Sequence, residues 1–127
     1  MAMAGADLVL APSCTDTMAG ANRVHVGARA RALENQIYVA VAPTVGEAPW
    51  SPAVDVNVGW AALYATPDRG FPEDGILAKG ELNAPGWIFA DLDFALLRAA
   101  RANAQVFTRA DWDSQNIPSL RVTQAHL

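Results

Sequence analysis

The sequence predicts an α+β fold, and three observations carry that prediction. An apolar run at residues 7–12 is followed by a helical pattern at residues 19–36 and by a β-branched and aromatic run at residues 37–42. This order is typical of a strand–helix–strand unit. Shorter apolar runs separated by Pro and Gly follow at residues 60–93, which favours a meander of strands after that unit.

Turn and cap residues divide the first half of the chain. The first apolar run is bounded by Gly5 and Pro12. Asp16 is the expected N-cap of the helix that follows, since its side-chain oxygen can accept from a free helix N–H. On that helix Arg31 and Glu34 are three residues apart, the spacing of an ion pair across one turn, so we expect them to pair and Glu34 to have a structural role.

The second half begins with a loop at residues 43–59 that has Trp50 near its centre. Loops of this length inside a domain are usually functional. Asp93 is the expected N-cap of a last helix, and Trp60 and Trp87 are expected in the core. The apolar runs between the loop and this helix predict strands at residues 60–65, 75–82 and 86–93.

The composition indicates a chain with a large apolar core and no affinity for polyanions. Of the 127 residues, 52% are hydrophobic and the formal net charge is −4, which argues against nucleic acids and anionic membranes as partners. The length suits one domain, which we place at residues 1–108 with an irregular tail at residues 109–127. Because neither a membrane-length apolar run nor a signal-peptide pattern is found, we expect a cytoplasmic protein. The mean hydropathy of +0.12 is high for a small domain, which predicts an apolar face covered by a partner.

Candidate chemical groups are few. The single cysteine, Cys14, follows the first predicted strand, where open α/β sheets often place their sites. An independent thiol enzyme with His25 as the base is the hypothesis that we rank lowest, because His25 is expected on the helix surface and nothing brings it to Cys14. One Cys and two His residues predict no metal site. No glycine-rich loop matches a phosphate-binding motif, so we expect no cofactor and find no complete catalytic site.

Two stretches carry a family resemblance. They are Ala4-Gly-Ala-Asp-Leu-Val-Leu-Ala-Pro-Ser13 and Ala28-Arg-Ala-Arg-Ala-Leu-Glu-Asn-Gln-Ile-Tyr-Val39. Both resemble the nitrilase, or carbon–nitrogen hydrolase, superfamily, the second through its Glu-Asn-Gln helix end followed by a Tyr-Val strand. The resemblance extends over residues 4–106. It implies an α-β-β-α sandwich of which this chain is the carboxy-terminal part, truncated on its amino-terminal side.

The resemblance also implies an activity and a set of site residues. Family members hydrolyse a small amide or nitrile with a Glu-Lys-Cys triad, through a Cys thioester. The motif that holds the nucleophile is absent from this chain, as are the Glu and Lys regions, so no residue here is expected to be catalytic. Ser13, Cys14 and Thr15 match positions that line the substrate pocket, and Trp50 is expected near the same pocket. Glu34 matches a family glutamate with a mainly structural role.

Two hypotheses follow from this resemblance. The leading one is the carboxy-terminal part of an amidase- or nitrilase-like hydrolase, reached through a truncated gene or a late start codon and inactive alone. The alternative is a non-catalytic partner subunit or remnant that completes a sandwich with a separately encoded amino-terminal half. Family members commonly dimerise through helices equivalent to residues 20–35, which implies a homo-oligomer.

Overall fold

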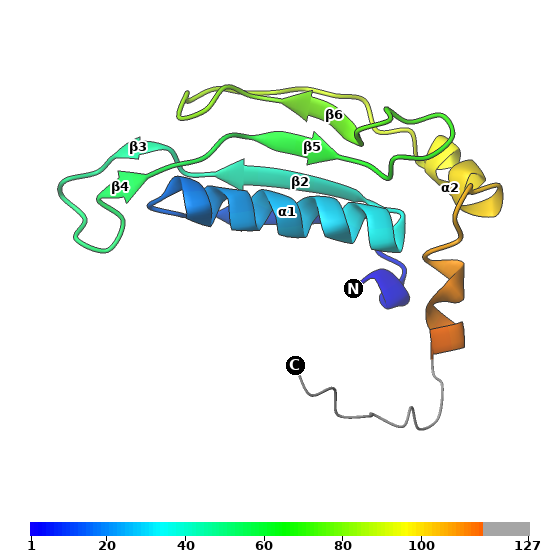
Figure 1. The fold of residues 1–127 in the computed structure, drawn as a ribbon. Coiled ribbons are helices and arrows are strands. Elements are labelled where there is room, and N and C mark those ends of the chain that lie inside the picture. Colours follow the sequence, from blue (N-terminus) through cyan, green and yellow to red (C-terminus); the bar gives the residue numbers. More distant parts are fainter. Residues whose placement is uncertain (116–127) are drawn as a thin grey trace, which may run out of the picture.

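The chain folds into a mixed β-sheet with helices packed on it (Figure 1). The computed structural model describes residues 1–115. The described elements are η1 (Ala2–Ala4), β1 (Leu8–Ser13), α1 (Met18–Asn35), β2 (Tyr38–Pro43), β3 (Gly46–Glu47), β4 (Val56–Asn57), β5 (Ala62–Tyr64), β6 (Ile76–Lys79), α2 (Phe94–Ala102) and η2 (Ala110–Gln115).

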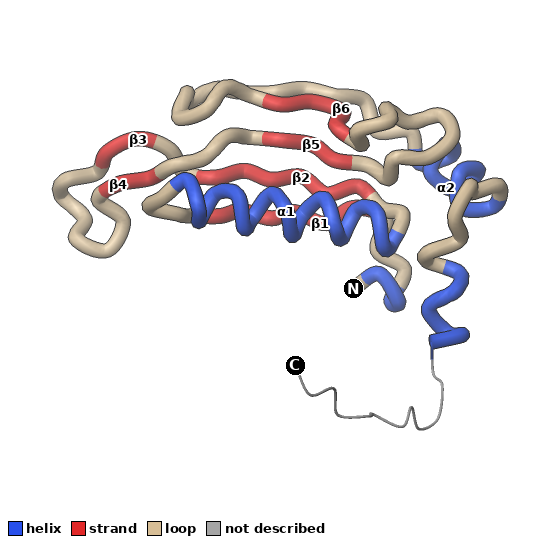
Figure 2. The backbone as a smooth tube through the Cα atoms, viewed as in Figure 1, coloured by secondary structure: helices blue, strands red, loops and turns tan. Residues whose placement is uncertain are grey.

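The main sheet has the strand order β1-β2-β5-β6. β1 and β2 are parallel and are joined through α1, whereas β2–β5 and β5–β6 are antiparallel. This topology confirms the predicted strand–helix–strand start and the meander after it. β3 and β4 form a separate hairpin inside the long loop, and this hairpin extends from the end of the sheet opposite to α2 (Figure 2).

α1 covers one face of the sheet. Its N-cap is Thr17, whose hydroxyl accepts from the Gly20 amide at 3.1 Å. The prediction of Asp16 as the cap was therefore wrong by one residue, because Thr17 is the residue with the extended backbone that places its oxygen over the first turn. The helix ends where Gln36 adopts a left-handed conformation with φ of 49°.

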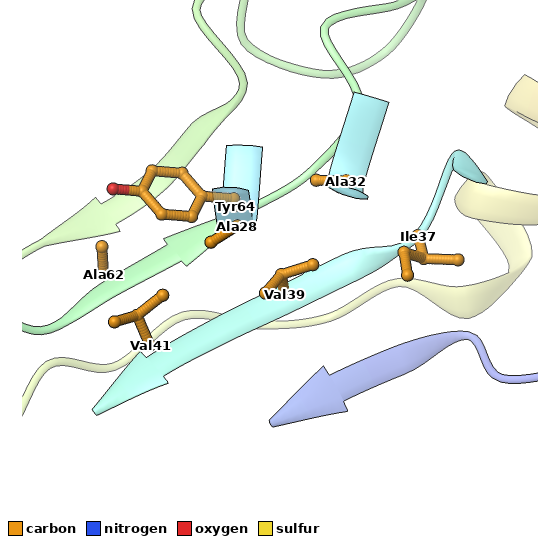
Figure 3. Close-up of a cluster of buried hydrophobic side chains, with 7 residues drawn as sticks. All are labelled: Ala28, Ala32, Ile37, Val39, Val41, Ala62 and Tyr64. Carbon is orange, nitrogen blue, oxygen red and sulfur yellow. The ribbon is translucent and has the colours of Figure 1, made fainter. Parts of the chain in front are cut away.

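The main core lies between α1 and the sheet. Figure 3 shows Ala28 and Ala32 of the helix together with side chains from β2 and β5. Because the helix contributes small side chains here, its backbone can approach the sheet closely. Trp60 packs against this core, as predicted. The cluster consists of Ala28, Ala32, Ile37, Val39, Val41, Ala62 and Tyr64.

His25 also lies in this interface, which contradicts its predicted place on the helix surface. Its side chain is buried, and its Nδ1 is hydrogen-bonded to the Tyr64 hydroxyl at 2.7 Å. A buried imidazole is tolerated where a partner satisfies its polar atoms. The bond to Tyr64 supplies that partner.

α2 covers one end of the opposite sheet face. Asp93 caps this helix as predicted, since its carboxylate accepts from the amides of Ala95 and Leu96. Leu97 is fully buried against Tyr38, whose hydroxyl donates to the Asp93 carbonyl at 2.8 Å. These contacts leave the rest of that face uncovered by α2.

The strand predicted at residues 86–93 is not formed. The prediction rested on apolar side chains, but a strand also needs a neighbouring strand for its backbone hydrogen bonds. The proline at position 85, directly before the segment, lacks an N–H to donate to one. Trp87, expected in the core, is 89% exposed instead.

The start of the predicted irregular tail is regular, because residues Ala110–Gln115 form the short helix η2. The part of this prediction that concerns residues 116–127 lies outside the described residues. Within residues 1–115, no helix has the length and apolar character needed to cross a bilayer. The α-β-β-α sandwich stays a prediction, since the described residues form one helix-covered sheet.

Candidate functional site

Polar side chains gather where β1 and β2 end, at the base of the β3–β4 hairpin. We call Cys14, Thr15, Thr44 and Asn57 the Asn57 cluster. β1 and β2 are parallel, so their carboxyl ends lie at the same edge of the sheet, which is where open α/β sheets place their sites. Cys14 and Thr15 directly follow β1, Thr44 directly follows β2, and Asn57 belongs to β4.

Asn57 holds this cluster together. Its Oδ1 accepts from the Cys14 thiol at 3.0 Å and from the Thr44 hydroxyl at 2.8 Å. Its Nδ2 donates to the carbonyl oxygens of Gly46 at 3.2 Å and Val54 at 2.7 Å. The buried amide therefore uses both of its atoms, which fixes its orientation.

Backbone pairing fixes the residues next to this amide. The Thr15 hydroxyl donates to the Val58 carbonyl at 2.7 Å, and the Val58 amide donates to the Thr15 carbonyl at 2.7 Å. The Thr44 amide donates to the Ser13 carbonyl at 2.9 Å. Side-chain and backbone hydrogen bonds thus join the base of the hairpin to the end of β1, and the end of β1 to the end of β2.

The predicted pocket residues are only partly brought together. Ser13, Cys14 and Thr15 lie at or beside the Asn57 cluster. Trp50, however, lies in the loop between β3 and β4, and its side chain is 81% exposed. A place near the same pocket stays a prediction for Trp50.

Thr44 and Asn57 were missed by the sequence-based prediction. A signal for Asn57 is present in the alternation Val54-Asp-Val-Asn-Val58, which is the period-two pattern of a strand. In that pattern Asn57 takes a polar position, yet it is buried. No local signal identifies Thr44, because its role depends on Asn57, which is 13 residues away.

An apolar groove of about 660 Å³ lies on the sheet face opposite to α1. Its floor is a row of paired residues across the sheet, in which Ala40 pairs with Leu63 and Leu63 with Ala78. Trp87 and Phe89, from the segment between β6 and α2, also line it. Leu10 pairs with Ala40 at the end of the same row and is 70% exposed.

The Asn57 cluster can form hydrogen bonds, and it supplies no general base to the Cys14 thiol. The Cys14 thiol contacts a neutral amide, which cannot take its proton. His25 has Tyr64 as its partner, so the structure does not bring His25 to Cys14. Among residues 1–115, no group of three or more His, Cys, Asp or Glu side chains could hold a metal ion.

Arg31 and Glu34 form the predicted ion pair, with a distance of 2.6 Å between Nη2 and Oε2. Both side chains are exposed, and such pairs contribute little to stability. The backbone of Glu34 has a further contact, because its carbonyl accepts from the Trp112 indole N–H at 3.2 Å.

Comparison with known proteins finds a relative in Bacillus subtilis (strain 168) that bears the name "Probable hydrolase YhcX". The two sequences are 34% identical over 102 residues, which are 80% of this chain and 20% of the relative. The chain thus spans about a fifth of the length of the curated relative that it matches. No protein-family model matches the chain.

Proposed function

We propose that this chain is the carboxy-terminal part of a carbon–nitrogen hydrolase of the nitrilase type. The observation that carries the proposal is the 34% identity to a probable hydrolase across 80% of the chain. The resemblance of two sequence stretches to the nitrilase superfamily supplies the finer class. The motif that carries it, at residues 28–39, comprises the last turns of α1, the cap residue Gln36 and the start of β2.

In this proposal the reacting groups come from a part of the enzyme outside this chain. A Cys thiolate attacks the amide carbon, the amine leaves with a proton, and water then hydrolyses the thioester to a carboxylic acid. The Asn57 cluster contains no base, which fits a supporting role. Ser13, Cys14 and Thr15 would form part of the pocket wall and would hydrogen-bond a polar substrate.

The uncovered sheet face supports the proposal. It has an apolar floor of Ala40, Leu63 and Ala78, and Leu10 at its edge is largely exposed. Exposed apolar surface of this kind marks a site of interaction. We propose that a second sheet, supplied by the rest of the enzyme, packs on this face, as sheets do in a two-layer core about 10 Å thick.

A chimeric enzyme tests this proposal. The 102-residue aligned segment of the Bacillus relative is exchanged for the matching segment of this chain, and ammonia release is measured with a panel of simple amides and nitriles. The intact relative is assayed on the same panel. We expect the chimera to hydrolyse the amides or nitriles that the relative hydrolyses in this assay, and we expect this chain alone to release no ammonia.

Two controls make the result decisive. A chimera with Leu10→Lys places a charge in the proposed sheet–sheet interface and should lose activity, whereas Glu73→Lys, in the exposed loop before β6, should not. The proposal fails if this chain alone hydrolyses an amide and Cys14→Ser abolishes that activity. It also fails if neither the chimera nor the intact relative acts on any carbon–nitrogen bond tested. A stop codon directly upstream of Met1 in the gene would instead favour the separately encoded partner subunit.

A further inference from the structure

Two arginines and one buried glutamine are among the residues that line a second cavity, which shares no residue with the apolar groove. It has a volume of about 400 Å³ and lies between η1, the carboxyl end of α1, α2 and η2. Arg101, Arg109 and Gln36 line it. These residues come from three separate parts of the chain, so the cavity depends on the tertiary fold.

Positive charge exceeds negative charge among the side-chain contacts at this cavity. Arg101 donates from Nη1 to the Asp7 carboxylate and from Nε to the Gln36 carbonyl at 2.8 Å. Arg109 donates to the carbonyl oxygens of Asn35 at 3.2 Å and Ala2 at 3.0 Å, which carry no charge. These contacts therefore include two guanidinium groups but one carboxylate, that of Asp7.

Partial burial disfavours the charged form of Arg109. Burial and the neighbouring charge of Arg101 lower the pKa of Arg109, and Asp7 only partly offsets them. The hydrogen bond from Arg101, opposed by burial, lowers the pKa of Asp7. Asp7 is thus paired with Arg101, whereas no carboxylate contacts Arg109 among the described residues.

Unpartnered donors give a second and independent indication. Gln36 is only 1% exposed, and its Nε2 has no hydrogen-bond partner among the described residues. The Nη2 atom of Arg101 is also buried and has no hydrogen-bond partner within residues 1–115. Buried donors in folded proteins are nearly always satisfied, so these two donors leave unused hydrogen-bonding capacity on two residues that line one cavity.

We propose that the cavity lined by Arg101, Arg109 and Gln36 binds a small oxyanion, such as inorganic phosphate or the carboxylate of a small acid. An oxyanion presents several acceptor oxygens to guanidinium and amide donors and carries the missing negative charge. The volume of the cavity is ample for such a group. The site is separate from the proposed hydrolase pocket and does not depend on it.

Isothermal titration calorimetry of the 127-residue chain tests this site, with phosphate in one arm and acetate in the other, in a chloride buffer of constant ionic strength. We expect saturable binding of one anion per chain. Saturation with phosphate alone would assign a tetrahedral oxyanion, and saturation with acetate alone a carboxylate. Absence of saturable binding in both arms would overturn the proposal.

Matched variants separate a built site from general charge attraction. Arg109→Gln should weaken binding by about tenfold or more, whereas Arg23→Gln, which removes the same charge from the exposed side of α1, should change it less than about twofold. Equal effects of the two would refute the site. Should Arg109→Gln fail to fold, Gln36→Glu decides the matter. It adds a carboxylate to the cavity wall and should abolish anion binding while the circular dichroism spectrum stays native, and unchanged binding would refute the site.

Discussion

The imidazole ring of His25 lies flat against the indole ring of Trp60, with centroids 3.8 Å apart and planes 5° from parallel. The same imidazole is hydrogen-bonded through Nδ1 to Tyr64, and the Lys79 ammonium lies 5.4 Å from the centre of the Trp60 ring. His25 of α1 is thus fixed between two aromatic side chains at β5. A charged imidazolium at this place would be buried and would lie near a second cation.

Stability is expected to fall in mild acid because of His25. Burial lowers the pKa of His25 from its ordinary value of 6.5. The unfolded chain therefore binds a proton at a higher pH than the folded chain, so this contribution is complete above pH 6.5 and is lost as the pH falls through the lower folded pKa. Urea unfolding at a series of pH values from about 8 to about 5, roughly the range in which imidazole titrates, measures the pH dependence of the unfolding free energy.

The matched control for this pH dependence replaces both partners. In the double variant His25→Phe with Tyr64→Phe, the stacked ring is kept and neither hydroxyl nor imidazole is left unpaired. We expect a flatter dependence of the unfolding free energy on pH over the same range. An unchanged slope would show that another group causes the acid sensitivity.

Leu97→Ala should be much more destabilising than Leu82→Ala. Leu97 of α2 is fully buried against Tyr38 of β2. Truncation of its side chain to alanine therefore leaves a cavity and costs about 2–5 kcal/mol of stability. Leu82 lies at an exposed position in the loop after β6, so its truncation should change stability by less than about 0.5 kcal/mol. Chemical denaturation of the two variants gives the comparison, and similar losses would contradict the packing of α2 on this face.

The uncovered sheet face opposite to α1, where Leu10 is exposed beside Ala40, should make the isolated chain self-associate. Leu10 lies on β1, an edge strand of the sheet, and pairs with Ala40 on the uncovered face. Lysine on such a strand discourages association, so Leu10→Lys should reduce the sedimentation coefficient of the associated chain and change its stability by less than about 0.5 kcal/mol. If Val26→Lys disperses the chain instead, the outer side of α1 is the associating surface.

Arg31 and Glu34 should couple weakly. They are exposed and three residues apart on α1, and pairs of this kind contribute about 0.2–0.5 kcal/mol. A double-mutant cycle with Arg31→Ala and Glu34→Ala measures the coupling free energy directly. A coupling free energy several times larger, roughly above 1 kcal/mol, would contradict the prediction that this exposed pair is weak.

Elements with strong local signals could be predicted from the sequence. The runs at residues 7–12 and 37–42 and the helical pattern at residues 19–36 correspond to β1, β2 and α1 within one or two residues. Asp93 as a cap was also predictable, because its carboxylate contacts the amides of the next turn. In each case the residues that decide the structure are neighbours along the chain.

Features that depend on distant partners could not be predicted in this way. His25 is buried because Tyr64, 39 residues away, satisfies its imidazole. The segment at residues 86–93 has apolar side chains but is not paired with any strand of the described sheets, so it is not a strand, and Trp87 is exposed. Thr44 and Asn57 meet Cys14 only because the hairpin returns to the ends of β1 and β2.

The double use of the Asn57 amide has a consequence for how this protein can change over evolution. All four hydrogen bonds of that amide go to the hairpin base, to β-strand ends or to the last residues of the turn, and none goes to residues 48–53. Substitutions at the tip, including at Trp50, can therefore accumulate without displacing Cys14 or Thr44. The Asn57 amide thus places no constraint on the tip, whereas any replacement of Asn57 itself would disturb both strand ends at once.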